Sequence, residues 1–251
     1  MAKTFATQMF GLQVRIVREL NNAHIFLEEA CLRLVKGRER YASSSSKAEK
    51  RYYVPAEERQ KFAKRTDAEV TGIYDQYLAT GLYEAFLVST LSRFESFLAD
   101  VLAAFFLAYP MRITERVQGI PAYPQMSAAD IIGADDKNQL MRVMIQAHLE
   151  QVFRQRPSDY MKYVVQILGL QNDKSFLDYY EVAATRDLVV HNSCVINELY
   201  MQKAGKKARG ELGKRLAVNE KYFYSALAKM KKVSGAIKRD VEKKYHLKSK
   251  G

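Results

Sequence analysis

LYEAFLVSTLSRFESFLADVLAAFFLAY, residues 82–109, decides the fold of this 251-residue chain. Apolar side chains recur in it every three or four residues, as they do on the buried face of a helix. They include Phe86, Leu87, Leu91, Phe94, Leu98, Leu102 and Phe105. Pro110 stops the pattern. The longest apolar run, residues 101–109, is about half of what a membrane span requires, so we expect a buried helix and no membrane partner.

The rest of the chain shows further helical patterns separated by short polar breaks. Gly37 and the serine run at residues 43–46 are expected to end the first helix, and Pro55 to begin the second. Asp173 and Asn219 are suited to cap the last two long helices. The expected helices cover residues 9–36, 55–80, 82–109, 128–132, 137–153, 157–168, 174–191 and 219–245.

These patterns predict an all-α helical bundle that forms one domain over residues 1–251. Its core is expected at about residues 82–245, with the helices of residues 9–80 packed on it. No β-rich region is expected; residues 195–201 fit a short strand or a short helix equally well. Residues 203–213 should form a basic, glycine-interrupted loop.

The positive charge is concentrated at the C-terminal end of the sequence. Residues 202–251 hold 16 Lys/Arg and 4 Asp/Glu, which accounts for the whole net charge of +12. Such a region favours a polyanionic partner, although a solvated, lysine-rich helix explains the charge equally well. Six of its residues are candidates for binding an RNA backbone: Lys203, Lys206, Lys207, Arg209, Lys214 and Arg215.

Cysteine and histidine usage argues against disulfide and metal frameworks. The two cysteines, Cys31 and Cys194, lie far apart in sequence, and the four histidines are too scattered for a metal site. We therefore expect no cofactor, and a reducing, cytoplasmic location. No phosphate-binding glycine loop, dinucleotide fingerprint or nucleophile elbow is present in the sequence.

One segment, TRDLVVHNS at residues 185–193, combines the groups that RNA cleavage needs. Histidine exchanges protons near neutral pH, and arginine binds phosphate through a planar fork. RNA supplies its own nucleophile, the 2′-hydroxyl beside the phosphodiester, so His191 and Arg186 would suffice without a metal. Asp187 lies one helical turn before His191 and is expected to orient the imidazole. The alternative is a helix-ending histidine that is merely paired to Asp187.

The spacing within this segment raises a geometric problem. Arg186 and His191 are five residues apart, about 140° around an ideal helix. They would point together only if the helix frays at Asn192, or if a second copy of the chain supplies the missing partner.

The segment RDLVVHNSCVINELY resembles the HEPN superfamily, and in particular its RiboL-PSP-HEPN branch. The resemblance rests on Arg186, Asp187 and His191 in an Arg-x4-His pattern, followed by Asn192. The upstream LSRFESFLADVL, with Glu95 as a supporting residue, is also similar. The likeness covers about residues 82–245, although its sharp part is short.

The resemblance implies a helical bundle that dimerises through its motif helices. It also implies metal-independent endoribonuclease activity that leaves a 2′,3′-cyclic phosphate, often in toxin–antitoxin or antiphage systems with a cognate antitoxin or defence partner. Arg186 would hold the phosphate, His191 would act on the 2′-hydroxyl, and Asp187 and Asn192 would assist. A non-catalytic RNA-binding protein or scaffold is the alternative. Tyr52, Tyr53 and Tyr200 could stack on bases or simply pack.

Overall fold

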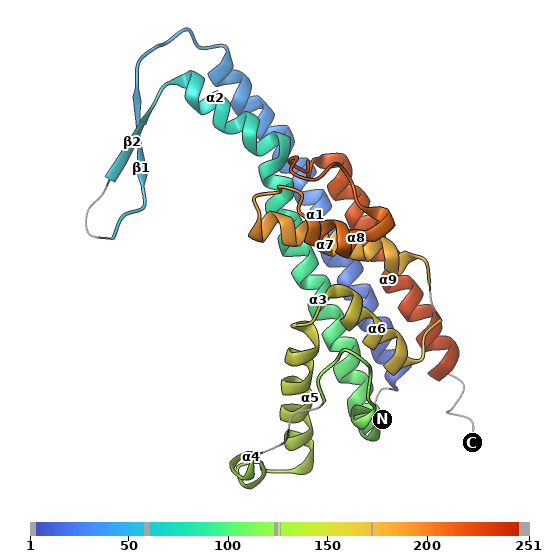
Figure 1. Cartoon of the computed structure of the whole chain (residues 1–251). Coiled ribbons are helices and arrows are strands. Elements are labelled where there is room, and N and C mark those ends of the chain that lie inside the picture. The colour runs from blue at the N-terminus through green and yellow to red at the C-terminus, as the bar shows by residue number, and fades with distance from the viewer. Residues whose placement is uncertain (1–3, 58–60, 123–124, 126, 172, 246–251) are drawn as a thin grey trace.

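The computed structural model describes residues 4–57, 61–122, 125, 127–171 and 173–245. Its elements are the helices α1 (Phe5–Ala42), α2 (Asp67–Gln76), α3 (Leu82–Ala108), α4 (Ala128–Ile132), α5 (Lys137–Phe153), α6 (Pro157–Leu168), α7 (Ser175–His191), α8 (Glu198–Ala204) and α9 (Glu220–Tyr245), and the strands β1 (Lys50–Val54) and β2 (Lys61–Arg65). The predicted all-α helical bundle is confirmed (Figure 1).

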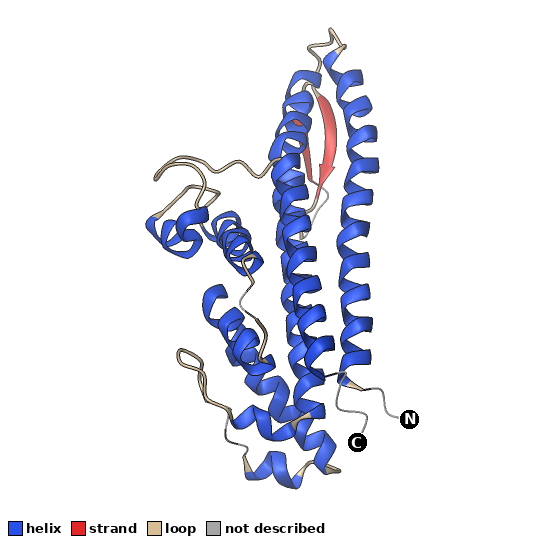
Figure 2. Cartoon of the chain, turned by 90° about the vertical axis from the view of Figure 1, so that its right-hand side faces the viewer, coloured by secondary structure: helices blue, strands red, loops and turns tan. Residues whose placement is uncertain are grey.

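Three long helices, α1, α3 and α9, run side by side and form the body of the molecule (Figures 1 and 2). Of the predicted α3 core, Phe86 is only half-buried. The others are fully buried: Leu87, Leu91, Phe94, Leu98, Leu102 and Phe105. The Phe5 ring lies 5.3 Å from that of Phe105 and 5.5 Å from that of Tyr245. The start of α1 therefore meets the ends of α3 and α9.

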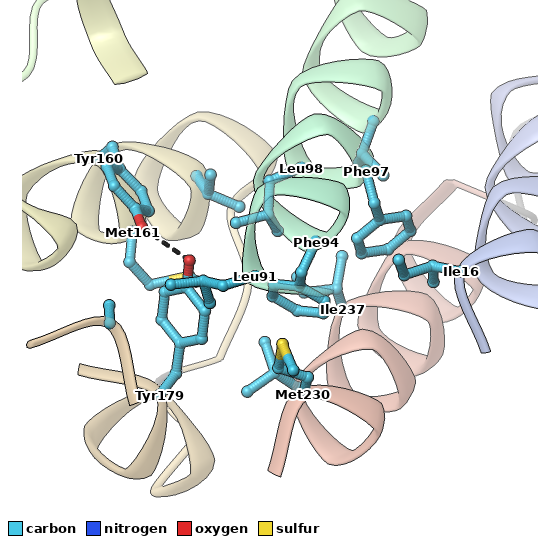
Figure 3. Close-up of a cluster of buried hydrophobic side chains, with 14 of the residues drawn as sticks. Ile16, Leu91, Phe94, Phe97, Leu98, Tyr160, Met161, Tyr179, Met230 and Ile237 are labelled. Atoms are coloured by element: carbon cyan, nitrogen blue, oxygen red, sulfur yellow. Dashed lines mark hydrogen bonds between the residues drawn. The ribbon is translucent and has the colours of Figure 1, made fainter. Parts of the chain in front are cut away.

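The helices α6 and α7 close one side of this body. Figure 3 shows Tyr160 and Met161 of α6 and Tyr179 of α7 packed toward Leu91 and Phe94 of α3. The hydroxyls of Tyr160 and Tyr179 are buried and lie 2.6 Å apart. Tyr160 donates its own hydrogen to Glu95 and so accepts one from Tyr179, which leaves both buried hydroxyls hydrogen-bonded.

The helix predicted over residues 55–80 is wrong in its first part. Residues 50–54 and 61–65 instead form an antiparallel hairpin, in which Tyr53 is paired with Phe62. Aromatic and β-branched residues favour strands, and Pro55 directly follows β1 and does not begin a helix. The true helix start is Thr66, whose side chain and Glu69 form a reciprocal capping box. Residues 58–60, part of the predicted helix, lie outside the described residues.

The first helix does not end at Gly37 but continues to Ala42. A glycine costs a helix interior only about 1 kcal/mol. A Cβ at Gly37 would lie 2.9 Å from the hydroxyl of Tyr74, so the glycine allows α2 to approach α1 closely. The break predicted at Gly81 is a π-helical turn, Tyr77–Gly81, that joins α2 directly to α3.

Most other predicted boundaries are confirmed. The helices expected at 128–132, 137–153 and 157–168 have these bounds. The Asn219 side chain accepts a hydrogen bond from Tyr222 N, and that of Asp173 accepts one from Ser175 N. Within residues 195–201 the short helix is present, because α8 begins at Glu198, whereas Val195 forms only an isolated β-bridge with Arg215. None of the described helices is long and apolar enough to cross a membrane.

Candidate functional site

The motif lies at the C-terminal end of α7, and His191 is its last residue. Leu188 is 3% exposed and anchors this end of α7 in a small apolar cluster with Ile196, Tyr200 and other buried residues. The His191 side chain is exposed. The imidazole is therefore held on a fixed helix end and is accessible to solvent, as proton transfer to a substrate requires.

An unusual turn fixes the chain directly after His191. Ser193 and Cys194 both have positive φ, +48° and +63°, a conformation that is uncommon for residues other than glycine. Cys194 N donates to Leu188 O at 3.0 Å, and the Asn192 amide donates to Val195 O. Asn192 thus closes the turn.

Arg186 points from α7 toward α3. Its Nη2 lies 2.6 Å from Oε1 of Glu95, and the same carboxylate oxygen accepts a hydrogen bond from Tyr160 at 3.0 Å. Burial raises the pKa of the Glu95 carboxyl above its usual value, although Arg186 and Tyr160 oppose this shift. Glu95, suggested by the sequence as a supporting residue, is therefore the direct partner of the motif arginine.

Asp187 does not orient the imidazole as expected. Its carboxylate lies 2.6 Å from Lys203 Nζ and 3.6 Å from Arg186 Nε. Within the described part of the chain, the His191 side chain has no hydrogen-bond or ion-pair partner. The helical spacing does place Asp187 and His191 one turn apart, but the Asp187 carboxylate forms its ion pair with Lys203 of α8.

Two hollows flank this end of α7. The first, of about 180 Å³, is lined by His191, Asn192, Asn197 and Leu199 among others. The second, of about 230 Å³, is lined by Arg186, Glu95, Tyr160, Arg154 and Arg156 among others. Asp187 and Lys203 line both hollows. Arg186 and His191 thus lie in adjacent hollows that share a wall.

Sequence reasoning missed Arg154 and Arg156, which lie in the short connection between α5 and α6. Both are exposed, and neither guanidinium has an acidic partner among the described residues. Only the packing of α6 against α7 brings them to Arg186, so no local pattern could have identified them.

The six basic residues predicted to bind RNA have different environments. Lys203 lies at the two hollows, while Lys206 and Lys214 are exposed and have no side-chain partner among the described residues. Lys207 is paired with Asp178 at 2.8 Å, and Arg215 bridges Ser193 O and Glu84.

Arg209, predicted to bind RNA, makes several contacts within the fold. Its guanidinium carbon lies 3.5 Å from the centre of the Tyr222 ring, and Nε donates to Glu181 at 2.8 Å. Glu181 is 1% exposed and also binds Lys229 at 3.0 Å. Burial alone would raise the pKa of Glu181, but Arg209 and Lys229 together lower it. This buried cluster fastens α9 and the segment before it to α7.

In the described ranges, no three His, Cys, Asp or Glu residues are grouped to hold a metal ion. Comparison with known proteins gives no match: no family model fits the chain, and neither a curated protein nor a solved structure matches it significantly.

Proposed function

We propose that the chain is a metal-independent endoribonuclease whose site is the C-terminal end of α7. One observation carries the proposal. Lys203 belongs both to the hollow that holds the exposed His191 and to the hollow that holds Arg186, Arg154 and Arg156. A base and several phosphate-binding cations therefore lie within reach of one nucleotide step, although Arg186 and His191 are far apart around their helix.

The proposed reaction is attack of a ribose 2′-oxygen on the adjacent phosphorus. His191 removes the 2′-hydroxyl proton, the O2′–P bond forms and the P–O5′ bond breaks. The leaving 5′-oxygen takes up a proton from water, and protonated His191 later releases its proton to solvent, so the products are a 2′,3′-cyclic phosphate and a 5′-hydroxyl. Lys203 and the exposed guanidiniums of Arg154 and Arg156 would stabilise the charge on the non-bridging oxygens.

Arg186 can join this chemistry only if phosphate competes with Glu95 for its guanidinium. A homodimer would relieve this demand, because the partner could supply a second His191 or a second set of cations. Val190 and Leu199 beside the motif are 48% and 46% exposed and would suit such a contact. The antitoxin, the defence role and the cytoplasmic location stay predictions.

The alternative is a non-catalytic RNA-binding protein or scaffold. It is favoured by the pairing of Arg186 with Glu95 and of Asp187 with Lys203, which would let the motif serve only to hold α7 against α3 and α8.

Cleavage of a labelled single-stranded RNA in EDTA separates the two functions. We expect the wild type to give fragments ending in a 2′,3′-cyclic phosphate and His191→Ala to give none. His191 is exposed, so the melting temperature should be unchanged. His24→Ala, in a partly exposed histidine of α1, is the matched control and should cut normally. Intact RNA with all three proteins, or full activity of His191→Ala, would refute the proposal.

A further inference from the structure

The β1–β2 hairpin lies at the end of an arm that projects from the helical body (Figure 1). The arm consists of the last turns of α1 and the helix α2, which begins directly after β2. A lone two-stranded hairpin is marginally stable in water. Packing in the core therefore does not account for the exposed aromatic side chains of this projecting hairpin, whereas a binding partner would.

The two faces of the hairpin differ. On one face Tyr52 and Ala63 are half-buried, and Lys50 of the same face binds the buried carboxylate of Asp67 at 2.6 Å. This contact fastens the hairpin to the start of α2. The other face is therefore directed away from the arm.

The outward face is made of two cations and two aromatic rings. Arg51 and Tyr53 lie on β1, and their register partners Lys64 and Phe62 lie on β2. All four are exposed, with Tyr53 at 78% and Phe62 at 46%. The Arg51 guanidinium carbon lies 4.6 Å from the centre of the Phe62 ring. Charge and ring faces are thus interleaved on one small surface.

This arrangement is unfavourable for the isolated chain. Arg51 lies opposite Lys64, and Lys50 opposite Arg65, so like charges face each other in two successive pairs. Such pairs destabilise a hairpin. Asp67, 2.6 Å from Lys50, and Glu49, 3.4 Å from Lys64, offset the charge only in part. Residues 47–65 contain seven Lys/Arg and three Asp/Glu. A polyanion bound to the outward face would remove the repulsion between Arg51 and Lys64.

We propose that the outward face of the hairpin binds single-stranded nucleic acid. Bases would stack on Tyr53 and Phe62, while Arg51 and Lys64 contact the adjacent phosphates. Stacking requires unpaired bases, which excludes the interior of a duplex. The surplus of cations argues against an apolar protein partner. This surface adds a remote substrate-binding element to the proposed function, but binding there does not depend on cleavage at α7.

The test measures fluorescence polarisation of labelled RNA and DNA 12-mers in EDTA, with His191→Ala as the parent protein so that no RNA is cut. We expect the double variant Tyr53→Ala/Phe62→Ala to bind at least about tenfold more weakly. Tyr77→Ala, an exposed tyrosine of the π-helical turn at 52% exposure, is the control and should bind normally. Circular dichroism melting verifies the fold.

The charge variant Arg51→Gln/Lys64→Gln removes a repulsive pair and should therefore fold. We expect the slope of log affinity against log salt to fall by about 1.4, as for two lost phosphate contacts on a single strand. The control Arg18→Gln/Lys36→Gln, two exposed cations of α1, should leave the slope unchanged. Binding of RNA and DNA alike supports a general single-strand surface, and preference for RNA supports recognition of the substrate.

Unchanged affinity and slope in both hairpin variants would overturn the inference. So would equal binding of duplex RNA, or loss of a dimer in Tyr53→Ala/Phe62→Ala without loss of nucleic-acid affinity. Failure of the α7 proposal has a different signature: His191→Ala would still cut the RNA 12-mer, while the DNA 12-mer, which has no 2′-hydroxyl, would still report binding at the hairpin.

Discussion

Arg186 Nη2 lies 2.6 Å from Glu95 Oε1, and this ion pair joins the motif helix α7 to the central helix α3. Both side chains are 21% exposed, so water screens the pair only partly. The guanidinium is occupied, and a phosphate must displace or share Glu95 to reach it. Glu95 would therefore act as a competitor for RNA as well as a support for Arg186.

Removing the Glu95 charge should strengthen RNA binding. We expect Glu95→Gln to raise RNA affinity about fivefold, equivalent to roughly 1 kcal/mol for a partly screened pair. The amide still accepts from Arg186, so the free energy of unfolding should fall by only about 1 kcal/mol. Polarisation titration with RNA measures the first effect and urea unfolding the second. Glu150→Gln, an exposed acid of α5, should change neither; weaker binding by Glu95→Gln would show that Glu95 does not compete with RNA.

Glu181 should contribute more to the free energy of unfolding than Glu95 does. Glu181→Gln leaves Arg209 and Lys229 without their shared anion, and breaking a buried pair in this way costs about 3–5 kcal/mol. Urea unfolding at neutral pH measures the loss. Glu198→Gln, in the exposed first turn of α8, should stay within about 0.5 kcal/mol of the wild type. Equal stability of the two variants would mean that the cluster is not a structural anchor.

Periodicity and caps could predict much of the fold because these signals are local. The α3 stripe from Leu87 to Phe105 needed only helical spacing, and the Asn219 cap located the start of α9. The hairpin could not be predicted in this way, because each of its strands is stable only when paired with the other. The prediction that Gly37 ends the first helix failed for a similar reason. The glycine makes room for the Tyr74 ring, which comes from α2.

The candidate site, like the fold, could be predicted from the sequence only in part. Residue chemistry alone identified Arg186 and His191, but the contacts of Asp187 depended on Lys203, which lies on a different helix. A weak signal for Glu181 existed in the sequence, because it directly precedes Val182 and Ala183, which belong to the core. An acid at such a position needs buried cations, and their identity follows only from the fold.

Lys203 should matter more for cleavage than its neighbour Lys207. Lys203 lines both hollows and is paired there with Asp187, whereas Lys207 lines neither hollow, is paired with Asp178 and is 51% exposed. We expect Lys203→Gln to lower kcat/KM for RNA cleavage about 10²-fold, as for loss of one charge-stabilising group. Lys207→Gln should remain within about twofold of the wild type. The reverse order would place the scissile phosphate outside the shared wall of the two hollows.

The turn after His191 should tolerate glycine and reject a β-branched residue. Ser193 is exposed with φ +48°, where L-residues are strained. Ser193→Gly relieves the backbone strain but raises the conformational entropy of the unfolded chain. We therefore expect the free energy of unfolding to rise by up to about 1 kcal/mol. Ser193→Val should lose about 1–3 kcal/mol. Thermal unfolding orders the three proteins, and a valine variant as stable as wild type would contradict the left-handed turn.

The two carboxylates on α7 and α3 should respond to pH with opposite signs. The pKa of Glu181 is lowered in the fold, so its stabilisation is present above its unfolded value, about 4.3, and is lost as pH falls through the folded pKa. The advantage of wild type over Glu181→Gln in unfolding free energy should therefore shrink between about pH 5 and 3, by at most about 1.4 kcal/mol per pH unit.

The pKa of Glu95 is raised, so its contribution to stability is present below the unfolded value and is lost as pH rises through the folded pKa. Wild type should lose stability relative to Glu95→Gln over that rise. Urea unfolding of the three proteins from pH 3 to 7 measures both differences. If the unfolding free energies of both variants change with pH as that of the wild type does, the pKa shifts of Glu181 and Glu95 are refuted.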